Sequence, residues 1–176
     1  KADAEKILKL REHFDESKKI HKTVDLIKKI NDKTIIFTQF IATQSTLTSE
    51  LERVVYKVEQ INGSMSSEEK RHAIRKLKEG QSDILVSTES GSEGLNLQFC
   101  HNLINYDLPW NPMRVEQRIG RIHRIGQEYD VSIYNICVKD TIEEYILQKL
   151  YMKIDLFKLA IGDMADIISE IIQEDS

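Results

Sequence analysis

The 176-residue chain has few of the residues that build disulfide-stabilised domains or metal sites. It has two cysteines, Cys100 and Cys137, whose spacing matches no zinc motif, and its five histidines are scattered along the chain. Two small core thiols in a reducing cytosol explain such a pair better than a disulfide or a zinc site does. We therefore predict that the protein binds no structural metal.

Long apolar runs are also missing. No stretch approaches the roughly 20 apolar residues of a membrane-spanning helix. The opening, KADAEKILKL, lacks the basic, apolar and small-residue regions of a signal peptide. We expect a cytoplasmic protein with no membrane partner. Because the sequence does not start with methionine, we also expect a fragment of a longer protein.

Several nucleotide-binding signatures are absent as well. The sequence contains no GxxxxGK[ST] phosphate loop, and no acidic magnesium motif follows an apolar strand. No GxGxxG follows the first predicted strand, which disfavours a Rossmann-type dinucleotide enzyme.

Charge is distributed unevenly. The net charge of −4 is unusual for a protein that binds nucleic acid, but the distribution matters more than the total. Residues 111–127 carry four arginines and one glutamate, whereas residues 139–176 carry four lysines and nine acidic residues. Only the first of these segments has the charge to face phosphates.

Apolar periodicity predicts strands that alternate with helices. Short apolar runs predict strands at 33–38, 58–61, 83–87, 103–106 and 131–138. Helical spacing predicts helices at 3–30, 40–54, 66–78, from 111 through the arginine segment, at 141–159 and at 163–173. Ser66 with Glu69, and Thr141 with Glu144, have the spacing of capping boxes. The alternation predicts an α/β fold, a parallel sheet flanked by helices, with extra N- and C-terminal helices.

The same pattern divides the chain into three parts. An N-terminal helical segment covers residues 1–30, an α/β lobe covers 31–140, and a C-terminal helical extension covers 141–176. Ligands of a parallel sheet bind at the C-terminal ends of its strands. The candidate binding loops are therefore those after Phe37, Ile61, Val86 and Tyr106.

The most informative stretch is QRIGRIHRIGQ at 117–127. It follows Asn111 and Pro112, a good N-cap and a good first helical residue. At about 100° per residue, one helix face collects Arg114, Gln117, Arg118, Arg121 and Arg124, and a neighbouring apolar stripe collects Val115, Ile119 and Ile122. Planar, permanently charged guanidinium groups beside a buried stripe suit phosphate oxygens. A solvated basic face with no ligand is the alternative.

Five segments in a fixed order carry a family resemblance: KTIIFTQF (33–40), INGS (61–64), VSTESGSEGLNLQ (86–98), DLPWNP (107–112) and the arginine segment. They resemble motifs IV, IVa, V and VI of the C-terminal RecA-like lobe of Swi/Snf-type ATPases, in superfamily 2 of nucleic-acid motors. The resemblance covers residues 33–139. It is strongest to the bacterial and archaeal branch, which includes RNA-polymerase-associated ATPases, and it implies a RecA-like sheet. Gly91-Ser92 departs from the two adjacent glycines more usual in eukaryotic remodellers.

The resemblance to motifs V and VI assigns nucleotide-site roles. Arg121 and Arg124 would be arginine fingers for the γ-phosphate of ATP, and Gln117 would either position them or contact the nucleotide. Gly94 and Asn96 would lie near the nucleotide ribose. Glycines 120 and 126 would allow a partner surface to approach the backbone closely. The resemblance leaves Arg114 and Arg118 open: each would pair with Glu116 or Asp107, or touch DNA.

Strand ends would contact the nucleic-acid backbone, through Thr38, Gln39, Gly63, Ser64, Ser87 and Thr88. Trp110, the only tryptophan, would either stack on a base or on a partner lobe, or be a partly buried anchor.

The resemblance implies the second motor lobe of an ATP-dependent DNA translocase. ATP with Mg²⁺ would be held mainly by an N-terminal RecA-like lobe, so we expect the chain alone to hydrolyse no ATP. Expected partners are double-stranded DNA, that N-terminal lobe, and RNA polymerase or another DNA-bound protein; a bacterial or archaeal protein would be nucleoid-associated. The alternative is a non-catalytic α/β module that binds a phosphate-bearing ligand or an acidic partner.

Overall fold

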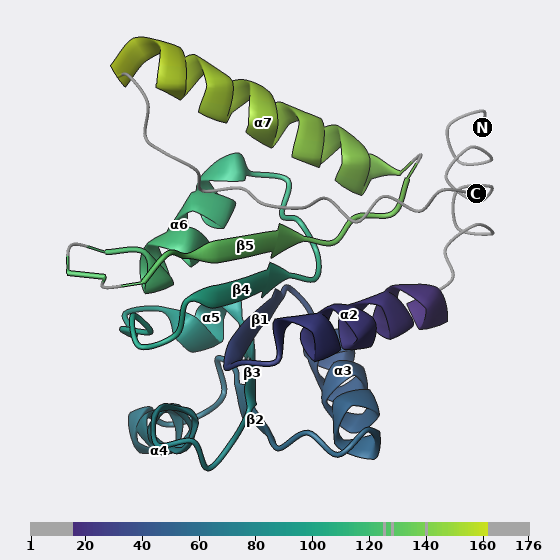
Figure 1. Ribbon diagram of the computed structural model, residues 1–176, viewed down its shortest axis with the longest axis vertical. Helices are drawn as coiled ribbons and strands as arrows, with labels where there is room; N and C mark the ends of the chain where they lie inside the picture. The colour runs from purple at the N-terminus through teal and green to yellow at the C-terminus, as the bar shows by residue number, and fades with distance from the viewer. Residues whose placement is uncertain (1–15, 125, 128, 140, 162–176) are drawn as a thin grey trace.

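The computed structural model describes residues 16–124, 126–127, 129–139 and 141–161. Its centre is a five-stranded sheet in the order β2-β3-β1-β4-β5, in which every neighbouring pair is parallel (Figure 1). The strands are β1 (Thr34–Thr38), β2 (Val58–Ile61), β3 (Ile84–Thr88), β4 (Asn102–Asn105) and β5 (Ser132–Asn135). The helices are α2 (Glu16–Ile30), α3 (Ile41–Arg53), α4 (Ser67–Lys78), α5 (Glu89–Ser92), α6 (Pro112–Ile122) and α7 (Ile142–Ile161).

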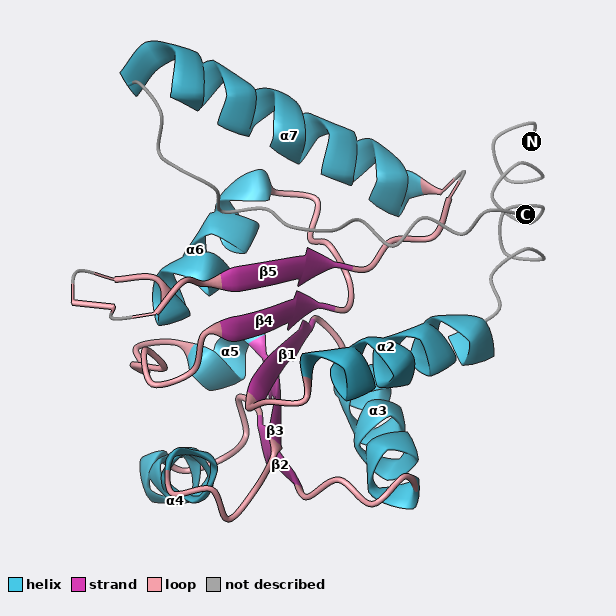
Figure 2. Cartoon of the chain, viewed as in Figure 1, coloured by secondary structure: helices cyan, strands magenta, loops and turns pink. Residues whose placement is uncertain are grey.

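Helices cover both faces of the sheet, as Figure 2 shows. α2 and α3 lie on one face, where Ile27 and Leu47 pack against Ile36 of the central strand. α4 and α6 lie on the other face, where a second cluster contains Ile35 and Phe37 of the same strand. Side chains of a strand point alternately to the two faces, so the continuous apolar run of β1 fills both clusters.

Helix α7, the last one described, packs against α6. Leu108 and Val115 share a third apolar cluster with Ile146, Leu147 and Leu150 of α7. α7 is also tied to α2, because the Lys19 ammonium lies 2.6 and 2.8 Å from the two carboxylate oxygens of Glu143. The N- and C-terminal described helices are therefore fastened to the lobe and to each other.

The predicted α/β class and parallel sheet are confirmed, and the five strands lie where the apolar runs placed them, although β5 is shorter than expected. The capping box at Ser66 is present in both directions. Thr141 accepts a hydrogen bond from the Glu143 N–H at 3.2 Å. The predicted helical residues 3–15 and the predicted helix 163–173 lie outside the described residues.

Two features of the described ranges bear on the kind of protein. None of their helices is long and apolar enough to cross a membrane. In the same ranges, no group of three or more His, Cys, Asp or Glu side chains is arranged to hold a metal ion.

Both cysteines are free thiols, and burial raises the pKa of Cys100 and of Cys137 to about 11. The thiolate is the reactive form, so a raised pKa and a buried sulfur both slow attack on a thiol reagent. We expect Cys100 in the folded protein at pH 8 to react with a chromogenic disulfide reagent far more slowly than after unfolding in guanidinium chloride. The half-buried Cys137 is expected to react at an intermediate rate; immediate labelling of Cys100 would contradict the packing described.

Candidate functional site

Helix α6 runs antiparallel to the strands, from the side of the sheet where the strands end to the side where they begin. It follows β4, and the Asn111 side chain caps it by accepting a hydrogen bond from the Met113 N–H at 3.0 Å. Its apolar stripe is buried: Val115 and Ile122 are fully covered and Ile119 is partly covered. The strands are parallel, so a helix between β4 and β5 begins at their C-terminal edge and ends at their N-terminal edge.

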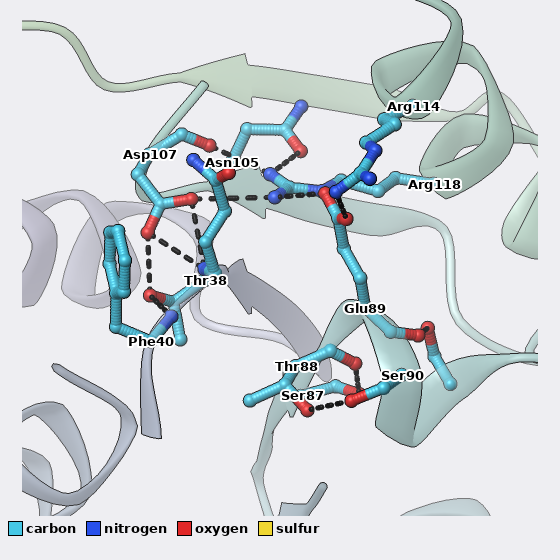
Figure 3. A network of polar contacts seen from close by, with 12 residues as sticks. Thr38, Phe40, Ser87, Thr88, Glu89, Ser90, Asn105, Asp107, Arg114 and Arg118 are labelled. Carbon is cyan, nitrogen blue, oxygen red and sulfur yellow. Dashed lines mark hydrogen bonds and ion pairs between the residues drawn. The ribbon is translucent and has the colours of Figure 1, made fainter. Parts of the chain in front are cut away.

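Arg118 points into the protein rather than along the exposed face of α6. Its side chain is 2% exposed and lies over the ring of Phe37. Its Nη1 donates to Asn105 Oδ1 (3.1 Å) and to the Asp107 carbonyl (2.7 Å). Its Nη2 donates to Glu89 Oε1 (2.8 Å) and to Asp107 Oδ1 (3.3 Å). Figure 3 shows the polar contacts of Arg118 with Asn105, Asp107 and Glu89.

Arg114, one turn earlier on α6, shares the same acid. Its Nη1 donates to Glu89 Oε2 at 2.9 Å, and its side chain is 55% exposed (Figure 3). One carboxylate thus bridges an exposed and a buried guanidinium. Of the alternatives considered from sequence, pairing with Asp107 is confirmed for Arg118, whereas Glu89 as the shared partner was not predicted.

The predicted single face of five polar side chains is therefore wrong at two positions. Arg118 lies four residues before Ile122, and side chains four apart share a face, so it belongs to the edge of the buried stripe. Arg124 lies beyond the helix, because the backbone becomes extended at His123 (φ −94°, ψ 99°).

The two predicted fingers lie outside this buried network. Arg121 is half-buried, and its side chain makes no hydrogen bond or ion pair within the described ranges. Arg124 is exposed, and its Nε donates to the Gly120 carbonyl at 2.9 Å. Gln117 is also exposed, one turn before Arg121 on α6. The end of α6 and the residues just after it thus present polar groups that no acid in the described part of the chain neutralises.

The loop after β3 reaches the same end of α6. Gly94, at φ +75°, turns the chain where residues with a side chain are strained, and Asn96 follows it on the surface. The side-chain oxygen of Asn96, Oδ1, accepts a hydrogen bond from the Gln98 N–H at 3.1 Å. The Leu97 N–H donates to the Arg121 carbonyl at 3.1 Å. This hydrogen bond brings the predicted nucleotide residues of the loop beside those of α6.

The strand-end residues form a separate group at the opposite end of α6. Thr38 is buried and its hydroxyl donates to Asp107 Oδ2 at 2.6 Å, while the Gln39 N–H donates to both oxygens of that carboxylate. Ser87 and Thr88 are also buried, with hydroxyls bonded inside the chain. Of the six predicted nucleic-acid residues, those exposed at the surface are Gly63 and Ser64, and Gln39 is half-buried.

Two aromatic side chains stand out at this edge. Trp110 is 70% exposed and Phe40 is 61% exposed. Trp110 is therefore not a partly buried anchor. Its exposed ring is available to stack on a base or on a partner lobe.

Comparison with known proteins places these features in a family. The family described as "Helicase conserved C-terminal domain" matches residues 18–126. An ATP-dependent helicase of Bacillus subtilis, YqhH, is 50% identical over 156 residues, which cover 89% of this chain and 28% of that protein. The RNA polymerase-associated protein RapA of Vibrio campbellii is 36% identical over 123 residues, covering 66% of this chain and 13% of RapA. This chain thus spans less than a third of these relatives.

Solved structures agree. The C-terminal part of the Fun30 ATPase domain superposes with a TM-score of 0.68 at 31% identity, over 74% of this chain and 44% of that one. The Escherichia coli DEAD-box protein SrmB, at 22% identity over 90% of this chain and 86% of that one, shares the fold with a TM-score of 0.71.

Proposed function

We propose that this chain, which belongs to the helicase conserved C-terminal domain family, is the second motor lobe of an ATP-dependent DNA translocase of the Swi/Snf type. The supporting observation is that, among the described residues, two arginines of the α6 segment pair with acids of the lobe and two do not. Arg114 and Arg118 are paired with acids inside the lobe. Arg121 and Arg124 have no acid partner in the described residues, which suits groups that complete a site held by another lobe.

Phosphoryl transfer to water builds charge on the oxygens of the transferred group, and guanidinium donors placed there lower the barrier. In the proposed role, Arg121 and Arg124 supply those donors across a cleft between lobes. Asn96, Gly94 and Gln117 lie beside them and line the nucleotide's approach. ATP and Mg²⁺ are bound mainly by the other lobe, which would carry the phosphate loop that this sequence lacks.

DNA is assigned to the opposite edge, where β1, β2 and β3 end. Gly63, Ser64 and Gln39 offer backbone amides and small polar side chains, which position a phosphate backbone without reading bases. The exposed Trp110 lies after β4, next along the same edge. In this arrangement α6 spans the distance between the DNA edge and the fingers: Arg114 and Arg121 are seven residues, or about 10 Å of helix, apart.

The partners follow from this role. They are double-stranded DNA and an N-terminal RecA-like lobe, and RNA polymerase or another DNA-bound protein is the candidate cargo, since RapA is described as RNA polymerase-associated. Residues 31–140 form the motor lobe in this proposal, and residues 1–30 and 141–176 are its N- and C-terminal extensions. Such a motor works in the cytoplasm, on the nucleoid if the source is bacterial or archaeal.

The chain alone is expected to release no phosphate from ATP above background, with or without double-stranded DNA, because half of the active site is missing. A continuous phosphate-release assay on the 176-residue chain measures this, and the full-length protein at the same concentration is the positive control. Rapid DNA-stimulated turnover by the chain alone would overturn the half-site proposal. A full-length protein without turnover would overturn the motor function.

A further inference from the structure

We propose that Arg118 is a positioning residue for ATP hydrolysis, which holds the strand-end loops and α6 together as one unit and so sets the position of Arg121. The inference rests on the proposed function and extends it to a residue that makes no contact with the nucleotide. Loss of the Arg118 contacts is expected to lower kcat and to leave the binding of ATP and DNA nearly unchanged.

Several segments of the chain meet at the Arg118 guanidinium. Arg118 bonds directly to Glu89 after β3, and to Asn105 and Asp107 at the end of β4. Asp107 in turn accepts from the Thr38 hydroxyl and the Gln39 N–H at the end of β1. Three neighbouring strands and α6 are thus joined at a single buried side chain.

The network also extends to the last strand and balances its charge. The Asn105 amide donates to Asn135 Oδ1 of β5 at 2.8 Å. Two guanidinium groups, of Arg114 and Arg118, face two carboxylates, of Glu89 and Asp107. A buried charge keeps its place only when it is paired and hydrogen-bonded. Loss of the buried Arg118 guanidinium would therefore leave the carboxylates of Glu89 and Asp107 without their buried counter-charge, whereas the exposed Arg114 can be replaced by water.

A further connection lies at the other end of α6. The Leu97 N–H donates to the Arg121 carbonyl, and the Gln127 amide donates to the carbonyls of Gln98 and Ile122, each at 2.9 Å. The loop that starts at Glu89 and the helix that carries Arg118 are thus tied at both ends. Any shift of α6 relative to the sheet would carry Arg121 with it.

The rate of ATP hydrolysis is expected to be sensitive to the position of α6, because Arg118 lies close to the proposed finger Arg121. Arg118 and Arg121 are separated by less than one turn of helix, so a small rotation of α6 displaces the Arg121 guanidinium by a similar amount. A misplacement of about 1 Å costs on the order of 10²-fold in rate when a catalytic group must meet a reacting atom. A lysine at 118 keeps the charge but loses the planar fork that reaches four acceptors.

The test uses the full-length protein with three variants: Arg118→Lys, Glu89→Gln and Arg114→Met. The first two are expected to lower kcat at least about tenfold while the KM for ATP and the Kd for double-stranded DNA stay within about twofold. Arg114→Met is the matched control, because Arg114 shares Glu89 on the same helix but is 55% exposed. Its kcat is expected to stay within about threefold of the unmodified protein.

Other outcomes would overturn the inference. They are an Arg118→Lys kcat within twofold of the unmodified protein, a loss carried by KM or by DNA affinity, or an equal loss in Arg114→Met. A thermal melt confirms that each variant is folded at the assay temperature; if Arg118→Lys is not, Glu89→Gln decides by the same criteria. Turnover by the unmodified protein, and its loss in Arg121→Ala, test the motor function separately.

Discussion

Arg121→Ala in the full-length protein is expected to lower the ATP turnover number by about 10³-fold or more, with the Kd for double-stranded DNA changed by less than about threefold. Arginine fingers contribute on the order of 10³–10⁵ to kcat in related phosphoryl-transfer enzymes. The structure adds a reason for expecting the full effect. Arg121 has no acid partner in the described ranges, so its charge is not already satisfied inside the lobe.

The measurement is steady-state ATP hydrolysis at saturating DNA, together with a DNA titration at the same ionic strength, because phosphate contacts depend strongly on salt. Arg114→Met is the control from the same helix, with its guanidinium paired to Glu89. A loss of DNA affinity with unchanged turnover would favour the non-catalytic module that binds a phosphate-bearing ligand. A loss of turnover alone separates the motor from that module.

The centre of the sheet was predictable from sequence because β1 and β3 are buried on both faces. β1 buries Ile35, Ile36 and Phe37 in two different clusters, and a fully buried strand needs no particular periodicity to be recognised. The Ser66 capping box was predictable for a related reason. Its two hydrogen bonds join residues three apart, so local sequence specifies them completely.

The site was only partly predictable, because its key contacts join distant segments. Glu89 and Arg118 are 29 residues apart and lie on different elements, and nothing local to either residue indicates the other. Helical periodicity found the apolar stripe of α6 but placed Arg118 outside it. At the edge of such a stripe, the burial of an arginine depends on whether a carboxylate from another segment lies within reach, and the fold determines this.

The glycines of the loop after β3 were also only partly predictable, because one of them is required by a contact with a distant segment. Two glycines three residues apart, Gly91 and Gly94, are compatible with a tight turn whose exposed amides bind an anion. In the structure the Gly91 N–H instead donates to the Thr88 hydroxyl, and Gly94 provides the turn with φ +75°. The reason for a glycine at position 91 is a neighbour from another strand, Ile61, which no local pattern reveals.

Gly91→Ala is accordingly expected to destabilise the lobe by about 2 kcal/mol, within the range of overpacked core substitutions. A Cβ at this position would lie 2.5 Å from the Ile61 carbonyl oxygen and 2.7 Å from Asn62 Cα. Both are backbone atoms of the β2 end, so they cannot turn aside as a side chain could. For a domain of this size the loss corresponds to a fall in Tm of roughly 4–8 °C.

Gly120→Ala is the matched control, and its sign is opposite. Gly120 is inside α6, and a Cβ there meets no atom of the described chain within 4 Å. Alanine in a helix is favoured over glycine by about 0.5–1 kcal/mol, so the Tm is expected to rise by a few degrees. Thermal melts of the 176-residue chain compare the two; equal effects would contradict the close approach at Gly91. In the full-length protein, a Gly120→Ala variant that is more stable yet slower in ATP hydrolysis would show that the space beside Gly120 is occupied by the other lobe during turnover.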